Sequence, residues 1–94
     1  MIIAVDYDGT LQAKDGTVNG DLLRRLAIEQ RCGNVIILWT CREGKRLTEA
    51  LQVLARHGFR PNFANQNAPQ TIRMLGYDPR KILADIYIDD KNAF

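Results

Sequence analysis

Largely apolar residues form three short runs in this chain, at 2–5, 34–39 and 86–88. Between them, leucine and alanine recur at helical spacing over 22–27 and again over 47–54. Runs without polar alternation are typical of parallel strands covered on both faces, and spaced leucines are typical of helices that bury one side. Strands that alternate with helices predict an α/β fold, a three-layer, Rossmann-like parallel sheet with flanking helices and right-handed crossovers.

Capping and turn residues set the expected boundaries of the two helices. Asn19 or Asp21 can cap the first helix, which we expect to end at Gly33. The second helix should begin near Gly44 and end at the pair 57–58, where a histidine precedes a glycine. We therefore expect His57 to act as a helix terminus, and not as a catalytic base.

Three segments give weaker signals. The segment 11–18 contains Asp-Gly, a dipeptide that favours tight turns, so a small hairpin-like flap is expected there. The segment 59–64 is a strand candidate interrupted by a proline. Within the turn-rich stretch 65–79, residues 71–75 are expected to form a short helix.

Composition narrows the class of protein. The 94 residues predict one domain, 1–94, and its 46% apolar and 26% charged residues are ordinary for a globular chain. The net charge of +2 gives no argument for nucleic-acid binding, so a nucleic acid enters only as a substrate. No run approaches the ~20 apolar residues of a membrane span, and no membrane partner is expected. The two cysteines, Cys32 and Cys41, form no disulfide framework, which favours a reducing, cytoplasmic setting.

Polar residues follow each strong strand, and ligands of parallel α/β sheets bind beyond these carboxyl ends. The residues are Asp6 and Asp8 after the first run, Thr40 and Arg42 after the second, and Asp89 and Asp90 after the third. Four carboxylates on one rim repel each other, and a hard cation with oxygen ligands, most simply Mg²⁺, offsets that repulsion. Acids loaded with a cation beside threonine, lysine and arginine are the components of a phosphoryl-transfer site.

The same residues match a known family. The segment Asp6-Tyr7-Asp8-Gly9-Thr10 resembles the DxDGT signature of the haloacid dehalogenase-like (HAD) phosphohydrolases. Thr40 resembles the second motif of that family, Lys81 the third, and Asp89-Asp90 the acidic fourth. The motifs occur in the expected order, and the resemblance covers nearly the whole chain. It implies a HAD-like fold and a Mg²⁺-dependent hydrolase of phosphomonoesters.

The resemblance also implies a role for each motif residue. Asp6 would attack phosphorus and form an aspartyl-phosphate, while Asp8 would act first as general acid and then as general base. Thr40 would donate a hydrogen bond to a phosphoryl oxygen, and Lys81 would neutralise charge on Asp6 and the phosphoryl group. The metal site would use Asp6, the backbone carbonyl of Asp8, and Asp89 with help from Asp90.

Several residues near these motifs have more than one interpretation. Lys45 or Arg80 competes with Lys81 for the third motif. Arg42 either binds the substrate phosphate or forms a surface ion pair with an acid of 43–49. Cys41 is expected to be a free thiol near the site, because a cysteine phosphatase needs its arginine several residues further on. Cys32 is expected to contribute to packing, and Trp39 to lie in the core or border the pocket.

Neither the segment after Thr10 nor the segment between Thr40 and Lys81 is long enough for a cap domain, so we expect a minimal, capless enzyme. An open site suits a phosphorylated substrate that is either a small metabolite or a macromolecule. The chain stops four residues after Asp90, so we expect the run 86–88 to lie at a sheet edge, where a homo-oligomer contact is an option.

A second class of function stays open. Receiver-like modules, which bind or accept a phosphoryl group without hydrolysing phosphoesters, also group acids, a threonine and a lysine at strand ends. They pair adjacent acids on the first strand and accept phosphate on a later one, which fits Asp6 and Asp8 poorly. A phosphoryl acceptor also has no need of a second acid at position 8. The hydrolase is therefore the favoured interpretation.

Overall fold

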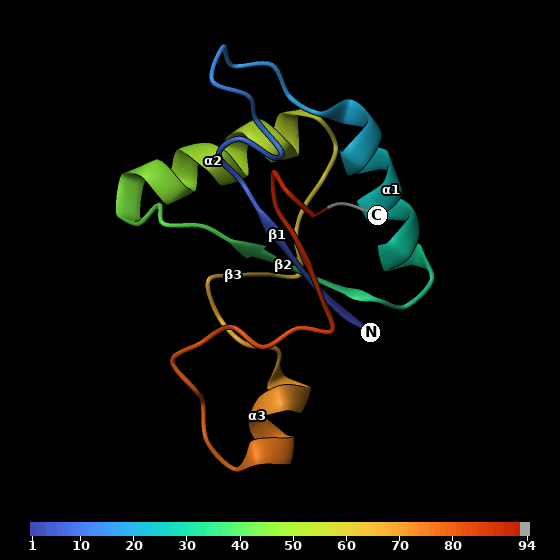
Figure 1. Ribbon diagram of the computed structural model, residues 1–94, viewed down its shortest axis with the longest axis vertical. Coiled ribbons are helices and arrows are strands. Elements are labelled where there is room, and N and C mark those ends of the chain that lie inside the picture. The colour runs from blue at the N-terminus through green and yellow to red at the C-terminus, as the bar shows by residue number, and fades with distance from the viewer. Residues whose placement is uncertain (93–94) are drawn as a thin grey trace.

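A computed structural model, in which residues 1–92 are described, has a four-stranded parallel sheet with helices on both sides (Figure 1). The elements are β1 (Ile2–Asp6), α1 (Gly20–Arg31), β2 (Val35–Trp39), α2 (Gly44–Arg56), β3 (Phe63–Ala64), α3 (Pro69–Leu75) and β4 (Ile86–Ile88). The strands lie in the order β3-β2-β1-β4, and every neighbouring pair is parallel. The predicted α/β fold is confirmed.

The two faces of the sheet are covered differently. Ile3 and Val5 of β1 pack with Ile36 and Leu38 of β2 against buried residues of α1 and α2, which form the main core. Because side chains alternate along a strand, the neighbouring residues of β1 and β2 point to the other face. There α3 and the segment 77–85 lie, on the opposite side of the sheet from α1 and α2 (Figure 1).

The helix boundaries agree with the capping residues. The side-chain oxygen of Asn19 accepts a hydrogen bond from the backbone of Leu22 at the start of α1, and α2 begins at Gly44 and is capped by His57, as expected. The third helix begins at Pro69, two residues before the predicted start, because proline suits the first helical turn. The expectation for Cys32 is wrong: it caps α1 and is exposed, because the helix ends there at the surface.

The weak signals also correspond to structure. Residues 13–16 form a turn in which Gly16 donates a backbone hydrogen bond to Ala13, and an antiparallel bridge joins Gln12 to Val18. This is the expected flap. The strand candidate at 59–64 reduces to the two residues of β3. β4 is an edge strand, as expected, and within residues 1–92 no helix combines the length and apolar character needed to cross a membrane.

Candidate functional site

The first and fourth motifs lie side by side where the strand order of the sheet reverses. From β1 the chain adds β2 and β3 on one side, and then returns to place β4 on the free side of β1. The carboxyl ends of β1 and β4 therefore lie side by side where the strand order reverses, the position at which open parallel sheets bind ligands. Asp6 ends β1, and Asp89 follows β4 in the register that pairs Val5 with Ile88. The sheet thus brings the first and last acidic motifs to adjacent positions.

Tyr7 separates the two aspartates of the first motif. Its side chain is fully buried, and its hydroxyl donates a hydrogen bond to Gln12 at 2.8 Å. Its backbone carbonyl accepts hydrogen bonds from Thr10, Leu11 and Gln12, so the loop curls around it. This anchoring leaves Asp6 partly buried on one side of Tyr7 and Asp8 exposed on the other.

Arg42 holds the carboxylate of Asp8. Its Nε and Nη2 atoms donate hydrogen bonds to the two carboxylate oxygens, at 3.0 Å and 2.9 Å, which is bidentate geometry. The guanidinium also lies over the Tyr7 ring, 4.8 Å from its centroid. This hydrogen bonding lowers the pKa of Asp8. The ion pair of Arg42 is thus with Asp8, and not with Glu43 or Glu49 as one sequence interpretation had it.

Asp6 has a different electrostatic environment. Burial raises its pKa most, and the negative charges of Asp8, Asp89 and Asp90 raise it further. A hydrogen bond from the backbone amide of Tyr7, at 2.8 Å, acts in the opposite direction. The carboxylates of both acidic motifs therefore act on Asp6.

Thr40 and the loop after β2 are fixed by Asn65, a residue that the sequence analysis did not select. The Asn65 side chain accepts a hydrogen bond from the Thr40 amide at 2.8 Å and donates one to the Arg42 carbonyl at 3.1 Å. Its backbone has φ of 52°, a left-handed conformation that asparagine tolerates better than most residues. The hydroxyl of Thr40 meanwhile accepts a hydrogen bond from the Arg42 amide. An asparagine directly after a strand was the available signal.

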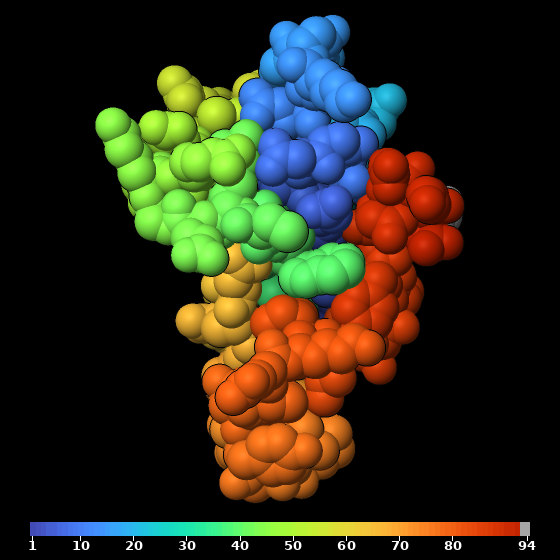
Figure 2. Space-filling view, turned by 60° about the vertical axis from the view of Figure 1, so that its left-hand side comes forward, coloured from blue at the N-terminus to red at the C-terminus, as the bar shows by residue number. Residues whose placement is uncertain are grey.

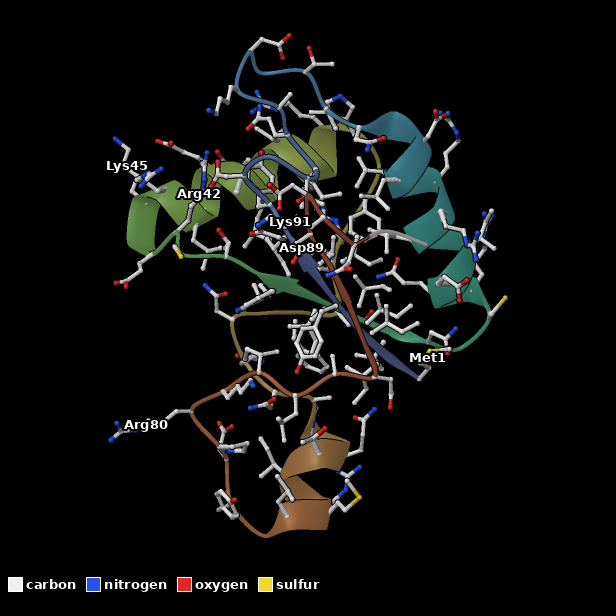
Figure 3. All side chains as sticks on the ribbon, viewed as in Figure 1. Met1, Arg42, Lys45, Arg80, Asp89 and Lys91 are labelled. Carbon is white, nitrogen blue, oxygen red and sulfur yellow. The ribbon has the colours of Figure 1, made fainter. Side chains whose placement is uncertain are left out.

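Asp89 is held by the turn that follows β4. Its Oδ1 atom accepts hydrogen bonds from the amides of Lys91 and Asn92, at 2.9 Å and 2.8 Å. Asp89, Lys91 and Arg42 lie toward the carboxyl end of the sheet, and Met1 lies at its amino end (Figure 3). The orientation of Asp89 is thus set by its own loop, and Lys91 adds a cation to this end of the sheet.

The four carboxylates do not form a ready-made metal cluster. Within residues 1–92, no three acidic, histidine or cysteine side chains are grouped closely enough to hold an ion. One reason is visible: the carboxylate of Asp8 is paired with Arg42. The smaller set implied by the family resemblance needs only the carboxylates of Asp6 and Asp89 and the backbone carbonyl of Asp8. That oxygen set suits Mg²⁺, and a cation there would offset the charge that raises the pKa of Asp6.

Lys81 lies in a segment braced by Asn67. Asn67 is buried, and its amide nitrogen donates hydrogen bonds to Asp78 and to the carbonyls of Pro79 and Lys81, each at 3.1 Å. Its side-chain oxygen accepts a hydrogen bond from the Leu83 amide. The Lys81 side chain is exposed, forms no ion pair with Asp6, and lines a hollow with Trp39 and neighbouring residues. Asn67 is the second positioning residue that the sequence analysis passed over.

Comparison with known proteins gives one informative likeness. The solved structure of the conserved protein coded by a locus from Bacteroides thetaiotaomicron has a TM-score of 0.82 and 34% sequence identity with this chain. The match covers 98% of this chain and 77% of the other. No protein-family model and no curated protein matches the chain.

Proposed function

This chain belongs to the same family as the conserved Bacteroides thetaiotaomicron protein, and we propose that it is a Mg²⁺-dependent phosphomonoester hydrolase of the capless HAD type. The observation that supports this most is the position of Asp6 beside Asp89 where the strand order reverses, with the charges of Asp8 and Asp90 also acting on Asp6. A partly buried carboxylate surrounded by like charges is costly unless a cation and an anionic substrate group use it.

In the proposed reaction, an oxygen of Asp6 attacks phosphorus while the bond from phosphorus to the ester oxygen breaks. Asp8 gives its proton to the departing alkoxide, and an aspartyl-phosphate remains on Asp6. A water molecule then loses a proton to Asp8 and attacks phosphorus, and the bond to Asp6 breaks. The products are the alcohol and inorganic phosphate, and both aspartates return to their starting states.

Arg42 explains how Asp8 serves both half-reactions. The ion pair keeps Asp8 ionised in the free protein, which is the form that accepts a proton from water. An arriving phosphate brings negative charge close to Asp8 and competes for the guanidinium, and both effects favour protonation of Asp8. Arg42 is thus proposed to contact Asp8 before the substrate binds and the phosphate afterwards.

The remaining groups bind charge. Mg²⁺, when bound, would neutralise the acids and the phosphoryl oxygens, held by Asp6, Asp89 and the carbonyl of Asp8, with Asp90 beside them. Thr40 would donate its hydroxyl proton to a phosphoryl oxygen, from a loop that Asn65 fixes. Lys81 is the proposed third-motif cation, and Lys91 is the alternative at the carboxyl end of the sheet.

The test is hydrolysis of a phosphomonoester panel that contains glycerol phosphate and p-nitrophenyl phosphate, with phosphate release as the readout. We expect turnover with Mg²⁺, none after chelation, and none in Asp6→Asn. Asp21→Asn, an exposed acid of α1, is the matched control and should retain full activity. Comparing Lys81→Ala with Lys91→Ala identifies the catalytic lysine, because only that variant should lose most of its kcat.

The outcome against the proposal is equally specific. If the folded, Mg²⁺-loaded protein releases no phosphate from any ester, the hydrolase assignment is wrong. Incubation with a small phosphodonor then tests the alternative. Stable labelling of one aspartate without phosphate release would identify a phosphoryl-accepting module.

A further inference from the structure

A hollow of about 320 Å³ opens beside the proposed catalytic site, lined by Trp39, Tyr87, Ile82, Arg80 and Lys81. In the space-filling view, the green segment that ends β2 lies between the blue N-terminal segment and the orange-red segment before β4 (Figure 2). Trp39, the only tryptophan of the chain, is 39% exposed there. An exposed tryptophan at the edge of a hollow offers a bound group a large, flat apolar surface.

The hollow lies next to Asp6 by strand register. Asp6 pairs with Trp39 across β1 and β2, and neighbouring strands are about 4.8 Å apart. Both residues alternate with core residues of the helix-covered face, so their side chains share the opposite face. Tyr87, which pairs with Ala4, belongs to the same face of β4. The hollow therefore lies beside Asp6, on the same face of the sheet.

The aromatic side of the hollow is rigid. Trp39 meets Tyr87 edge to face, with ring centroids 5.7 Å apart and planes at 70°. The Tyr87 hydroxyl donates to the Ile82 carbonyl at 2.7 Å and accepts from the Ala84 amide at 3.1 Å. These contacts fix the rings before any ligand arrives, which suits a stacking surface for a flat group.

The other side of the hollow is cationic. Arg80 and Lys81 are both exposed and lie in the segment whose carbonyls Asn67 holds. Arg80 extends outward from this segment, away from Asp89 (Figure 3). Positive charge on this side complements an anionic group that lies further from Asp6 than the reacting phosphate does.

We propose that this hollow binds the leaving group of the substrate, and that the leaving group is a nucleotide, with a flat base and a second phosphate. The base would stack at Trp39 and Tyr87, and the second phosphate would lie near Arg80. This assignment rests on the proposed hydrolase function. A neutral, small leaving group such as glycerol would use neither feature of the hollow.

Binding can be measured apart from catalysis, because Trp39 fluorescence reports directly on the hollow. The protein is titrated with adenosine 3′,5′-bisphosphate, adenosine 5′-monophosphate and ribose 5-phosphate, with Asp6→Asn used where Mg²⁺ is present. We expect saturable quenching by the bisphosphate at a Kd about fivefold or more below that of ribose 5-phosphate, since stacking one base contributes at least that factor. Equal affinities for all three would overturn the proposal.

Variants assign the effect to the two sides of the hollow, with affinity measured by equilibrium dialysis. Arg80→Gln should weaken bisphosphate binding about two- to fivefold and leave the monophosphate nearly unchanged, as expected for an exposed ion pair. Arg73→Gln, an exposed arginine of α3, is the matched control and should change neither. Trp39→Phe should retain binding, and Trp39→Leu should lose it with the circular dichroism spectrum intact. Unchanged affinity in both Arg80→Gln and Trp39→Leu would refute the assignment.

Turnover measurements then distinguish the hydrolase proposal from the leaving-group proposal, and a nucleic-acid end from a free nucleotide as the substrate. Hydrolysis of glycerol phosphate and of nucleotides at equal kcat/KM would reject the leaving-group inference and leave the hydrolase intact. Quenching without any hydrolysis would reject the hydrolase and keep the hollow as a nucleotide site. A 3′-phosphorylated dinucleotide preferred over the free bisphosphate would point to nucleic-acid ends, and the reverse preference to a free nucleotide.

Discussion

The ion pair between Arg42 and Asp8 gives the sharpest quantitative test of the site. The change is Arg42→Gln, combined with Asp8→Asn in a double-mutant cycle, so that only the interaction between the two side chains is measured. Glutamine keeps a polar side chain of moderate length but removes the charge and the two-pronged geometry. Arg42→Lys is the intermediate variant, because it keeps the charge and loses the fork.

The expected size of the coupling follows from geometry and exposure. Two charge-assisted hydrogen bonds, at 2.9 Å and 3.0 Å, would each contribute about 1.5–3 kcal/mol in a shielded place. The Arg42 side chain is 16% exposed, but that of Asp8 is 56% exposed, so water screens the pair. We therefore expect a coupling free energy of about 1 kcal/mol. The Arg42→Gln variant alone should lose more, because the contact with the Tyr7 ring adds about 0.5–1 kcal/mol.

The pH dependence has a defined sign. The folded pKa of Asp8 lies below its unfolded value of about 3.9, since Arg42 stabilises the ionised carboxylate. The stabilisation is therefore complete above the unfolded pKa and is lost as the pH falls through the folded pKa. We expect the same coupling at pH 7 and pH 5, and a smaller one at pH 3. In Arg42→Gln, the pKa of Asp8 should rise.

Urea unfolding followed by Trp39 fluorescence measures the free energies, and NMR titration of Asp8 measures its pKa. A coupling near zero at pH 7, or a pKa of Asp8 that does not rise in Arg42→Gln, would refute the electrostatic account of the site. A coupling that stays constant down to pH 3 would show that the contact acts through packing and not through charge.

Three further outcomes are expected. Asn65→Ala should destabilise the protein by about 2 kcal/mol and lower kcat, because it loses the hydrogen bond to Thr40 and strains a left-handed backbone. Asn65→Gly is free of that strain and should recover part of the stability but not kcat, as measured by urea unfolding and turnover. Asn67→Ala should cost about 2–4 kcal/mol and speed amide exchange around Leu83, and unchanged exchange there would contradict its bracing role. Asp6→Asn should raise Tm in metal-free buffer at pH 7, because burial and like charges penalise the ionised form of Asp6 once the pH exceeds its raised pKa. Mg²⁺ should raise the Tm of the wild type only, and an equal rise in Asp6→Asn would argue against a metal site at Asp6.

Local patterns in the sequence were enough to predict most elements. The apolar runs predicted β1, β2 and β4, and the spaced leucines predicted α1 and α2, because an element buried on one or both faces needs apolar residues at regular positions. The convergence of polar residues was also predictable, since the carboxyl ends of parallel strands share one edge. β3 is two residues long, and its short apolar segment gave correspondingly little signal.

The partners of the polar side chains could not be predicted. Arg42 and Asp8 are 34 residues apart in the sequence, and Asn65 and Thr40 are 25 apart. Each contact therefore depends on how the loops pack against the folded sheet. The same holds for Asn67, which joins the start of α3 to the segment before β4. Sequence patterns report a residue's own burial and backbone preference, and these three residues act through contacts made after the chain has folded.

The position of β4 decides whether the site exists. If β4 had continued the sheet beyond β3, three strand spacings of about 4.8 Å each would separate Asp89 from Asp6, roughly 14 Å in all. One Mg²⁺ ion, with ligands at about 2.1 Å, could not contact both carboxylates. Placing β4 beside β1 brings the two acids together and, by the same step, sets Tyr87 on the face that Asp6 shares with Trp39. The adjacent placement of Asp6 and Asp89 and the aromatic hollow are therefore two consequences of one reversal in strand order, and a substrate that uses one would lie within reach of the other.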